Sequence, residues 1–258
     1  MLKGKRIILT GVRNKRSVSF AILKDLLDKG AEVILTSPET ERTERAAKRL
    51  ENPPSVYELN VEEDDTIEKV KQVVQSEWQG NLDGLVHSIA YADRDCISDN
   101  FSLATEEQIM QGFRISSLSL WKLAKEFSPY LEGGGGVVSL SFDTSRIAPS
   151  YGWMNLFKDA LEYVNKIAAY ELGKKDIRVN CISAGPMMTS SARAIKGFRE
   201  LANKMEEAAP LEWDSGDATR FVAPLCSWLL SEESAKMTGE ILHVDSGANF
   251  ISSAKSGR

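Results

Sequence analysis

The chain has 258 residues, of which 42% are hydrophobic and 27% charged, and this length suffices for one α/β domain with a large core. Its net charge of -5 provides no basic field to attract a nucleic-acid backbone or an anionic membrane, so we expect neither as a partner. No apolar run approaches the length of a membrane span, and the first residues lack the pattern of a secretory signal. We therefore expect a cytoplasmic protein without membrane insertion.

The three cysteines, Cys96, Cys181 and Cys226, lie far apart in the sequence and form no CxxC pair. This spacing predicts neither a disulfide framework nor a zinc site. The two histidines, His87 and His243, have no potential metal ligand within a few residues. We expect no bound metal and a reducing compartment.

Short apolar runs alternate with amphipathic stretches along the chain, as is typical of repeated β–α units. We predict strands at residues 6–10, 32–36, 56–60, 82–88, 137–142, 177–182 and 240–244. The first predicted helix runs from about residue 17 to 27, and the second follows the strand at 32–36 and ends at about residue 50. Further helices are predicted over 64–78, 105–130, 151–172 and 218–230. Residues 252–258 are expected to be a frayed tail.

This alternation predicts a Rossmann-type, doubly wound α/β fold, with a mostly parallel seven-stranded sheet and helices on both faces. In such a fold the ligand crevice lies at the carboxyl ends of the strands. A run of four glycines at residues 133–136 is either a turn before the next strand or a flexible linker between domains. Because the alternation resumes at once, we expect a turn within a single domain, residues 1–258.

The end of the first strand has the features of a dinucleotide site. Gly11 would let the backbone turn beneath a pyrophosphate, and Ser17 would cap the helix whose N-terminus favours an anion. Alone this is a weak signal, because the GxGxxG pattern is absent and a single glycine at a strand end is often only a turn. It gains weight because residues 60–61, 87–92 and 184–189 also follow strands and would converge on the same crevice.

Five motifs occur in order along nearly the whole chain: Gly11-x5-Ser17, the run His87-Ser88-Ile89-Ala90-Tyr91-Ala92, Tyr151-x6-Lys158, Ala184-Gly185-Pro186-x-x-Thr189, and the segment 238–247. Together they resemble the enoyl-acyl-carrier-protein reductases of bacterial fatty-acid synthesis, which belong to the short-chain dehydrogenase/reductase superfamily. Residues 141–151 look closer to the mycobacterial long-chain enoyl reductase than to the common enterobacterial form.

The resemblance implies a nicotinamide dinucleotide as cofactor and an acyl-carrier-protein-bound enoyl thioester as substrate. It implies a cofactor site made of Gly11, Ser17, Val18, Ser37, Asn60, Val61, Ser88, Ile89, Ala90, Lys158, Met187 and Thr189. It implies a substrate site that includes Ala92, Phe142 and Met154, with Tyr151 and Lys158 as the catalytic residues.

The catalytic pair can also be examined from its spacing. A seven-residue step is almost two helical turns, so we expect Tyr151 and Lys158 to share one face of a helix. A phenol can donate a hydrogen bond and a proton to a developing enolate, and an ammonium can hold the nicotinamide ribose. The superfamily's carbonyl reductases carry a Tyr-x3-Lys pattern, whereas here Met154 stands four residues before Lys158. This difference favours reduction of a carbon–carbon double bond beside a thioester.

Two other functions remain open at this point. The chain could reduce a carbonyl or another activated alkene, or it could be a catalytically silent dinucleotide-binding homologue. The silent alternative is motivated by two departures from the family. Ser141 stands where many members have a second tyrosine, and Asn60 stands where they have an acidic residue near the adenine. Phe142 beside Ser141 is interpreted as a substitute lining residue, with ordinary core packing as the alternative.

A third departure is Phe157, which replaces a residue that is usually small in the family. Its bulk is expected to press on the neighbouring packing and to reshape the pocket.

The residues after the second strand bear on cofactor choice. A 2′-phosphate needs Arg or Lys there, whereas this chain has Ser37, Pro38 and Glu39. Glu39 would repel that phosphate. Arg42 and Arg45 could still swing back toward it, but at helical spacing they are expected on a solvated face. We therefore predict NADH rather than NADPH.

Residues 189–208 correspond to the family's mobile substrate lid. Ile195, Phe198, Ala202 and Met205 recur at helical spacing, and such a stripe can pack on the core, cover an acyl chain, or do both. Lys196, Arg199 and Lys204 could meet an acidic carrier protein, although charges opposite an apolar stripe are usually only solvated. The family also implies a homotetramer that packs through the helices at 105–130 and 151–172.

Overall fold

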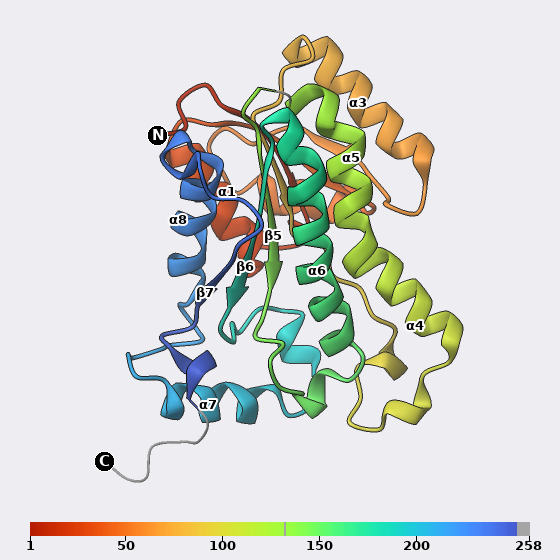
Figure 1. Ribbon diagram of the computed structural model, residues 1–258, viewed down its shortest axis with the longest axis vertical. Coiled ribbons are helices and arrows are strands. Elements are labelled where there is room, and N and C mark those ends of the chain that lie inside the picture. Colours follow the sequence, from red (N-terminus) through yellow and green to blue (C-terminus); the bar gives the residue numbers. More distant parts are fainter. Residues whose placement is uncertain (132, 252–258) are drawn as a thin grey trace.

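Seven strands form one parallel sheet at the centre of the protein (Figure 1). The structure is a computed structural model, and it describes residues 1–131 and 133–251. The strands in this part of the chain are β1 (Arg6–Thr10), β2 (Glu32–Ser37), β3 (Val56–Glu58), β4 (Gly84–His87), β5 (Gly136–Ser141), β6 (Arg178–Ala184) and β7 (Ile241–Val244). Their order is β3-β2-β1-β4-β5-β6-β7, and every neighbouring pair is parallel. The predicted fold class is therefore confirmed.

Helices cover both faces of this sheet (Figure 1). One core contains side chains of α1 (Val18–Asp28), α2 (Thr40–Ala47) and α8 (Thr219–Leu230), and the other contains side chains of α3 (Asp64–Trp78), α5 (Ser119–Leu131) and α6 (Met154–Leu172). In β1, Ile7 and Leu9 belong to the first core and Ile8 to the second. Burial of both faces explains why the strands read as continuous apolar runs. No helix among the described residues has the length and apolar character needed to cross a bilayer.

The predicted helix at 105–130 has the right extent but is not one regular helix. A π-helical turn, Arg114–Leu118, separates α4 (Glu106–Phe113) from α5. The hydroxyls of Ser116, Ser117 and Ser119 donate to the carbonyls of Tyr91, Phe157 and Ile115, respectively. Side-chain donors that compete for backbone carbonyls disturb the regular helical pattern, and π-turns are frequent near functional sites.

The glycine run leads directly from α5 into β5, which is a central strand of the sheet. Gly133 and Gly134 have φ values of 97° and 133°, which glycine adopts without a steric penalty. The run is thus a turn between a helix and its next strand, as predicted. Strand boundaries differ by at most two residues from those predicted; for example, β3 ends at Glu58. The predicted frayed tail at 252–258 lies outside the described residues.

Candidate active site

A cleft of about 2040 Å³ lies at the carboxyl ends of the strands, around the point where the strand order reverses between β1 and β4. Pockets for single small ligands usually measure about 300–1000 Å³, so this cleft has room for a dinucleotide and a second ligand together. All the residues that the sequence assigned to the site line it: Gly11, Ser17, Val18, Ser37, Asn60, Val61, Ser88, Ile89, Ala90, Ala92, Phe142, Tyr151, Met154, Lys158, Met187 and Thr189.

We call the part of the cleft formed by the ends of β1 to β4 the cofactor end. Gly11 has a φ of 80°, and a Cβ atom there would lie 2.0 Å from the carbonyl oxygen of Ser88. Only glycine fits such a close approach of two backbones. Ser17 caps α1 as predicted, because its hydroxyl accepts a hydrogen bond from the Phe20 amide at 3.3 Å. The geometry fits a pyrophosphate, because a capped helix N-terminus points its free amides at an anion.

Ser19 connects three elements of the cofactor end and was not singled out from the sequence. Its hydroxyl donates to the Gly11 carbonyl at 3.0 Å and lies 2.9 Å from the Ser88 hydroxyl. The Ser88 amide in turn donates to the Thr10 hydroxyl at 2.8 Å. This network fixes the ends of β1 and β4 and the first turn of α1 relative to one another. Its only signal in the sequence is a second serine just after the cap, which is too common to be informative.

Asn60 lies at the cleft, but its side chain is engaged in its own turn. Its Oδ1 accepts from the Glu62 amide at 3.1 Å, and its Nδ2 donates to Glu63 at 2.7 Å. Such local bonds are typical of Asn in turns. Asn60 therefore shapes the segment after β3, whatever contact it also makes to an adenine.

The end of β2 carries a cluster of charges. Glu39 lies 2.9 Å from the guanidinium of Arg42 and 3.9 Å from that of Arg13, and all three residues line the cleft. Arg42 is exposed, as expected, and it also lines the cleft, so the alternative that it reaches toward the site holds as well. Arg45 is exposed, as expected.

The part of the cleft formed by the β5–α6 connection is the catalytic end, and here the predicted helical register is wrong. Tyr151 lies in a 3-10 turn, Pro149–Tyr151, and α6 begins only at Met154. Gly152 between them has φ 52° and ψ -131°, and a Cβ there would lie 2.2 Å from the Cys96 carbonyl oxygen. Tyr151 and Lys158 thus reach the same cleft without sharing a helical face.

Asn155 holds the turn that carries Tyr151. Its Oδ1 accepts from the Ala148 amide at 3.0 Å, and its Nδ2 donates to the carbonyls of Ala148 and Gly152 at 3.0 and 2.7 Å. The Tyr151 amide also donates to the Ala148 carbonyl, at 2.9 Å. One amide side chain therefore uses its oxygen and its nitrogen to close the turn on both sides of Tyr151.

The electrostatic environment gives Tyr151 and Lys158 different protonation behaviour. Burial raises the pKa of Tyr151 far above its ordinary value, so the phenol keeps its proton at neutral pH. Burial lowers the pKa of Lys158 to about 8, so the amine is mostly an ammonium at pH 7. One donor of Lys158 bonds the Leu140 carbonyl at 2.7 Å, and an ammonium has two more to offer.

Aromatic side chains surround Tyr151. The ring centroid of Phe142 is 4.5 Å from that of Tyr151, and Phe198 packs edge-on at 6.1 Å. Phe142 lines the cleft and also packs against a small apolar cluster around Met154, so both interpretations of this residue hold. These rings pack on the Tyr151 ring, and burial of the phenol is the cause of its raised pKa.

Phe157 does not reshape the pocket, contrary to the expectation from its size. It is fully buried and does not line the cleft. Its ring fills space left by Gly112 on α4, where a Cβ would lie 2.3 Å from the ring. The glycine on the neighbouring helix therefore accommodates the extra bulk, a compensation that only the tertiary structure could reveal.

The segment 189–208 borders the cleft beside the catalytic end. It contains a short turn, Ala192–Ala194, and α7 (Phe198–Ala208). Phe198 and Ala202 are buried against Ala192, Tyr151, Met188 and Ile195, so the predicted apolar stripe does pack inward. Ser190 donates to Asn14 at 3.2 Å, which joins the start of this segment to the loop after β1. Lys196, Arg199 and Lys204 are exposed.

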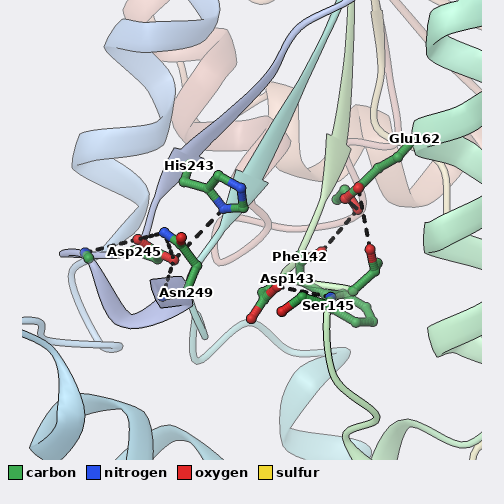
Figure 2. A network of polar contacts seen from close by, with 10 residues as sticks. Phe142, Asp143, Ser145, Glu162, His243, Asp245 and Asn249 are labelled. Atoms are coloured by element: carbon green, nitrogen blue, oxygen red, sulfur yellow. Dashed lines mark hydrogen bonds and ion pairs between the residues drawn. The ribbon is translucent and has the colours of Figure 1, made fainter. Parts of the chain in front are cut away.

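The residues after β7 complete the wall of the cleft. Asp245 is buried and accepts hydrogen bonds from the amides of Gly247 and Asn249 and from the Asn249 side chain (Figure 2). Arg146, in the loop after β5, donates to the Ile251 carbonyl at 2.7 Å. Segments from β5 and β7 are thereby fixed together at the opening of the cleft.

These features, a parallel sheet with a reversal of strand order and a capped helix at the end of β1, define the doubly wound α/β proteins that bind dinucleotides at the switch point. A family model described as Enoyl-(Acyl carrier protein) reductase matches residues 11–249. The chain therefore belongs to the enoyl-acyl-carrier-protein reductase family.

Individual relatives agree with this membership. The enoyl-acyl-carrier-protein reductase (NADH) of Mycolicibacterium smegmatis is 35% identical, and the alignment covers 96% of this chain and 97% of the relative. The corresponding NADH reductase of Synechocystis is 33% identical, over 97% of this chain and 98% of the relative. An NADPH reductase of Staphylococcus aureus is 34% identical, also over 97% and 98%. Relatives named for NADH and a relative named for NADPH thus have similar sequence identity to this chain.

Proposed function

We propose that this chain reduces trans-2-enoyl thioesters, carried on acyl carrier protein, to saturated acyl thioesters in fatty-acid synthesis. The observation that carries the proposal is the pairing of Tyr151 and Lys158 on the wall of one cleft, with Met154 in place of the tyrosine that a carbonyl reductase would need. The family membership of nearly the whole chain supports the same reaction.

The cofactor, when bound, would supply a hydride to the β-carbon of the enoyl group, and protonation of the α-carbon would then complete the reduction. Tyr151 would donate a hydrogen bond to the thioester oxygen as negative charge develops there, since its raised pKa keeps the proton on the phenol. Lys158 would hold the nicotinamide ribose hydroxyls with the donors not used by Leu140. The aromatic rings of Phe142 and Phe198 would keep water away from this oxygen.

For the cofactor, we propose NADH rather than NADPH. Glu39 occupies the end of β2 with Arg42 and Arg13 as its partners. A 2′-phosphate would have to displace this carboxylate from both guanidinium groups or face its negative charge. A 2′-hydroxyl carries no such conflict.

We propose that residues 189–208 act as the substrate lid within a single catalytic domain. The exposed cations Lys196, Arg199 and Lys204 on this segment would meet the acidic carrier protein. Ala92, Phe142 and Met154 would line the acyl site, and the loop at 141–151 would be of the mycobacterial type.

We also propose a homotetramer that packs through α6 and its neighbours. The outer face of α6 exposes Leu156, Tyr163, Ile167 and Tyr170, and Tyr170 is 74% exposed. A contiguous apolar face of this kind marks an interaction surface. Light scattering of the purified protein would measure the mass, and a monomeric mass at micromolar concentration would contradict this assembly.

The reaction is tested by following NADH oxidation by absorbance with enoyl thioesters of several chain lengths, and with carbonyl substrates as a comparison. We expect turnover of the enoyl thioesters and not of the carbonyl compounds. Turnover of carbonyl substrates alone would identify a different reductase. Tight NADH binding without turnover of any substrate would identify a silent homologue.

A further inference from the structure

Two side chains of α6, one helical turn apart, contact consecutive residues at the end of β5. Lys158 donates to the Leu140 carbonyl at 2.7 Å. Glu162 accepts a hydrogen bond from the Ser141 hydroxyl at the same distance, 2.7 Å (Figure 2). Side chains four residues apart on a helix lie on the same face, so both side chains face the end of β5. The helix thus fixes the strand end where the cleft begins.

Glu162 also reaches past the strand end to the loop. Its second carboxylate oxygen lies 3.3 Å from the Thr144 hydroxyl, which also donates to Asp159 at 3.2 Å. Ser141 and Thr144 flank Phe142, whose ring stacks on Tyr151 at 4.5 Å. A single carboxylate therefore holds the backbone on both sides of the aromatic ring that packs against Tyr151.

We infer that Glu162 is a positioning residue of the reductase: its carboxylate binds Ser141 and Thr144 to place Phe142 against Tyr151, and it lies one helical turn from Lys158, on which its charge acts. The inference rests on the proposed function. Many members of the family have a second tyrosine where this chain has Ser141. Here the Ser141 side chain instead donates a hydrogen bond to Glu162 and so joins the end of β5 to α6. Glu162 itself does not line the cleft.

Burial lowers the pKa of Lys158, and its interactions with Cys181 and with Glu162 raise it. His87 on β4 is neutral, because burial lowers its pKa to about 3. Cys181 on β6 is a neutral thiol, because burial raises its pKa to about 12. Burial raises the pKa of Glu162, and Asp159 adds to this, while the hydroxyls of Ser141 and Thr144 and the nearby His243 favour the carboxylate. Glu162 is the carboxyl group whose interaction opposes the loss of the Lys158 proton.

The test compares two ways of removing the contact. Glu162→Gln removes the charge and weakens the hydrogen bonds, whereas the double variant Ser141→Ala/Thr144→Val removes the two hydroxyls and keeps the carboxylate. We expect each to lower kcat for an enoyl thioester about tenfold, since either loosens Phe142 against Tyr151. The Kd for NADH should change less than kcat does, because Gly11, Ser17 and Ser88 at the cofactor end are untouched. Glu171→Gln, at the far end of α6, is the matched control and should leave both constants unchanged.

A second measurement separates positioning from simple stability. The pH dependence of trace labelling of Lys158 by acetic anhydride, read by mass spectrometry, reports the pKa of this lysine without requiring turnover. Glu162→Gln should move the labelling midpoint to lower pH by about half a unit, because the ammonium loses its counterion. Ser141→Ala/Thr144→Val should leave the midpoint in place.

Unchanged kcat in both variants, or an unchanged midpoint in Glu162→Gln, would overturn the inference. If Glu162→Gln fails to fold, the hydroxyl double variant still decides the positioning role through kcat. If the unmodified protein binds NADH but reduces no enoyl thioester, the proposed function fails. In that case the labelling of Lys158 still tests whether the charge of Glu162 acts on the pKa of Lys158.

Discussion

The two ends of the cleft are built in different ways. At the cofactor end, functional groups directly follow strands, and the parallel register of β1, β2 and β4 brings Gly11, Ser37 and Ser88 to one edge. At the catalytic end, Tyr151 lies in an irregular turn ten residues after β5, and the side chains of Asn155 and Glu162 determine where it sits. Regular strand pairing, with a small hydroxyl network, thus positions one end, whereas side-chain hydrogen bonds hold an irregular turn at the other.

This difference predicts separable effects of mutation. Changes at the cofactor end should alter the binding of the dinucleotide, and changes at the catalytic end should alter kcat while leaving that binding intact. The following substitutions test this separation, beginning with the largest expected effect.

Removing the phenol of Tyr151 should have the largest effect. Tyr151→Phe keeps the ring packing on Phe142 and deletes only the hydroxyl, so we expect kcat for enoyl thioesters to fall about 10²–10⁴-fold. The Kd for NADH, measured by fluorescence, should stay within about twofold. Retention of full activity would remove Tyr151 from the proposed chemistry.

Two glycine substitutions compare the ends directly. Gly11→Ala and Gly152→Ala each force a Cβ against a backbone carbonyl, at 2.0 and 2.2 Å, with positive φ in both cases. We expect a loss of stability of about 1–3 kcal/mol for each, measured by thermal or denaturant unfolding. At equal stability loss, Gly11→Ala should weaken NADH binding, and Gly152→Ala should mainly lower kcat. The same kinetic pattern in both variants would contradict the separation of the two ends.

Loss of the Asn155 hydrogen bonds should have the next largest effect. Asn155→Ala removes three hydrogen bonds around Ala148 and Gly152, and we expect kcat to fall about tenfold as the Tyr151 turn loosens. Adding Tyr151→Phe to this variant should cost less than it does in the unmodified protein, because both changes act on the same group. Strict additivity of the two effects would show that Asn155 acts elsewhere. Glu171→Ala on the same helix is a suitable control.

The smallest expected effect concerns cofactor choice. Glu39→Gln removes the carboxylate paired with Arg42 and Arg13 and leaves both guanidinium groups available to a 2′-phosphate. Because these groups are about half exposed, we expect only a three- to tenfold gain in kcat/KM for NADPH relative to NADH. Glu41→Gln, an equal charge change outside the cleft, should leave the ratio unchanged. A ratio unaltered by Glu39→Gln would remove this residue from cofactor selection.

Much of the molecule was predictable from the sequence. The strands and most helices follow from apolar periodicity, and the cap at Ser17 and the turn at Gly11 follow from residue chemistry at a strand end. The helical register of Tyr151 was wrong because Gly152 adopts a backbone conformation that periodicity does not encode. The π-turn before α5 was missed because its serines bond carbonyls of distant segments.

The sequence by itself determined the fold class, the order of the elements and the residues that meet at the cleft, because apolar periodicity and residue type at the strand ends are local properties. Only the tertiary structure decided how Tyr151 is held, why Phe157 fits against Gly112, and which arginines pair with Glu39. Each of these depends on contacts between segments whose separation in space no local pattern specifies.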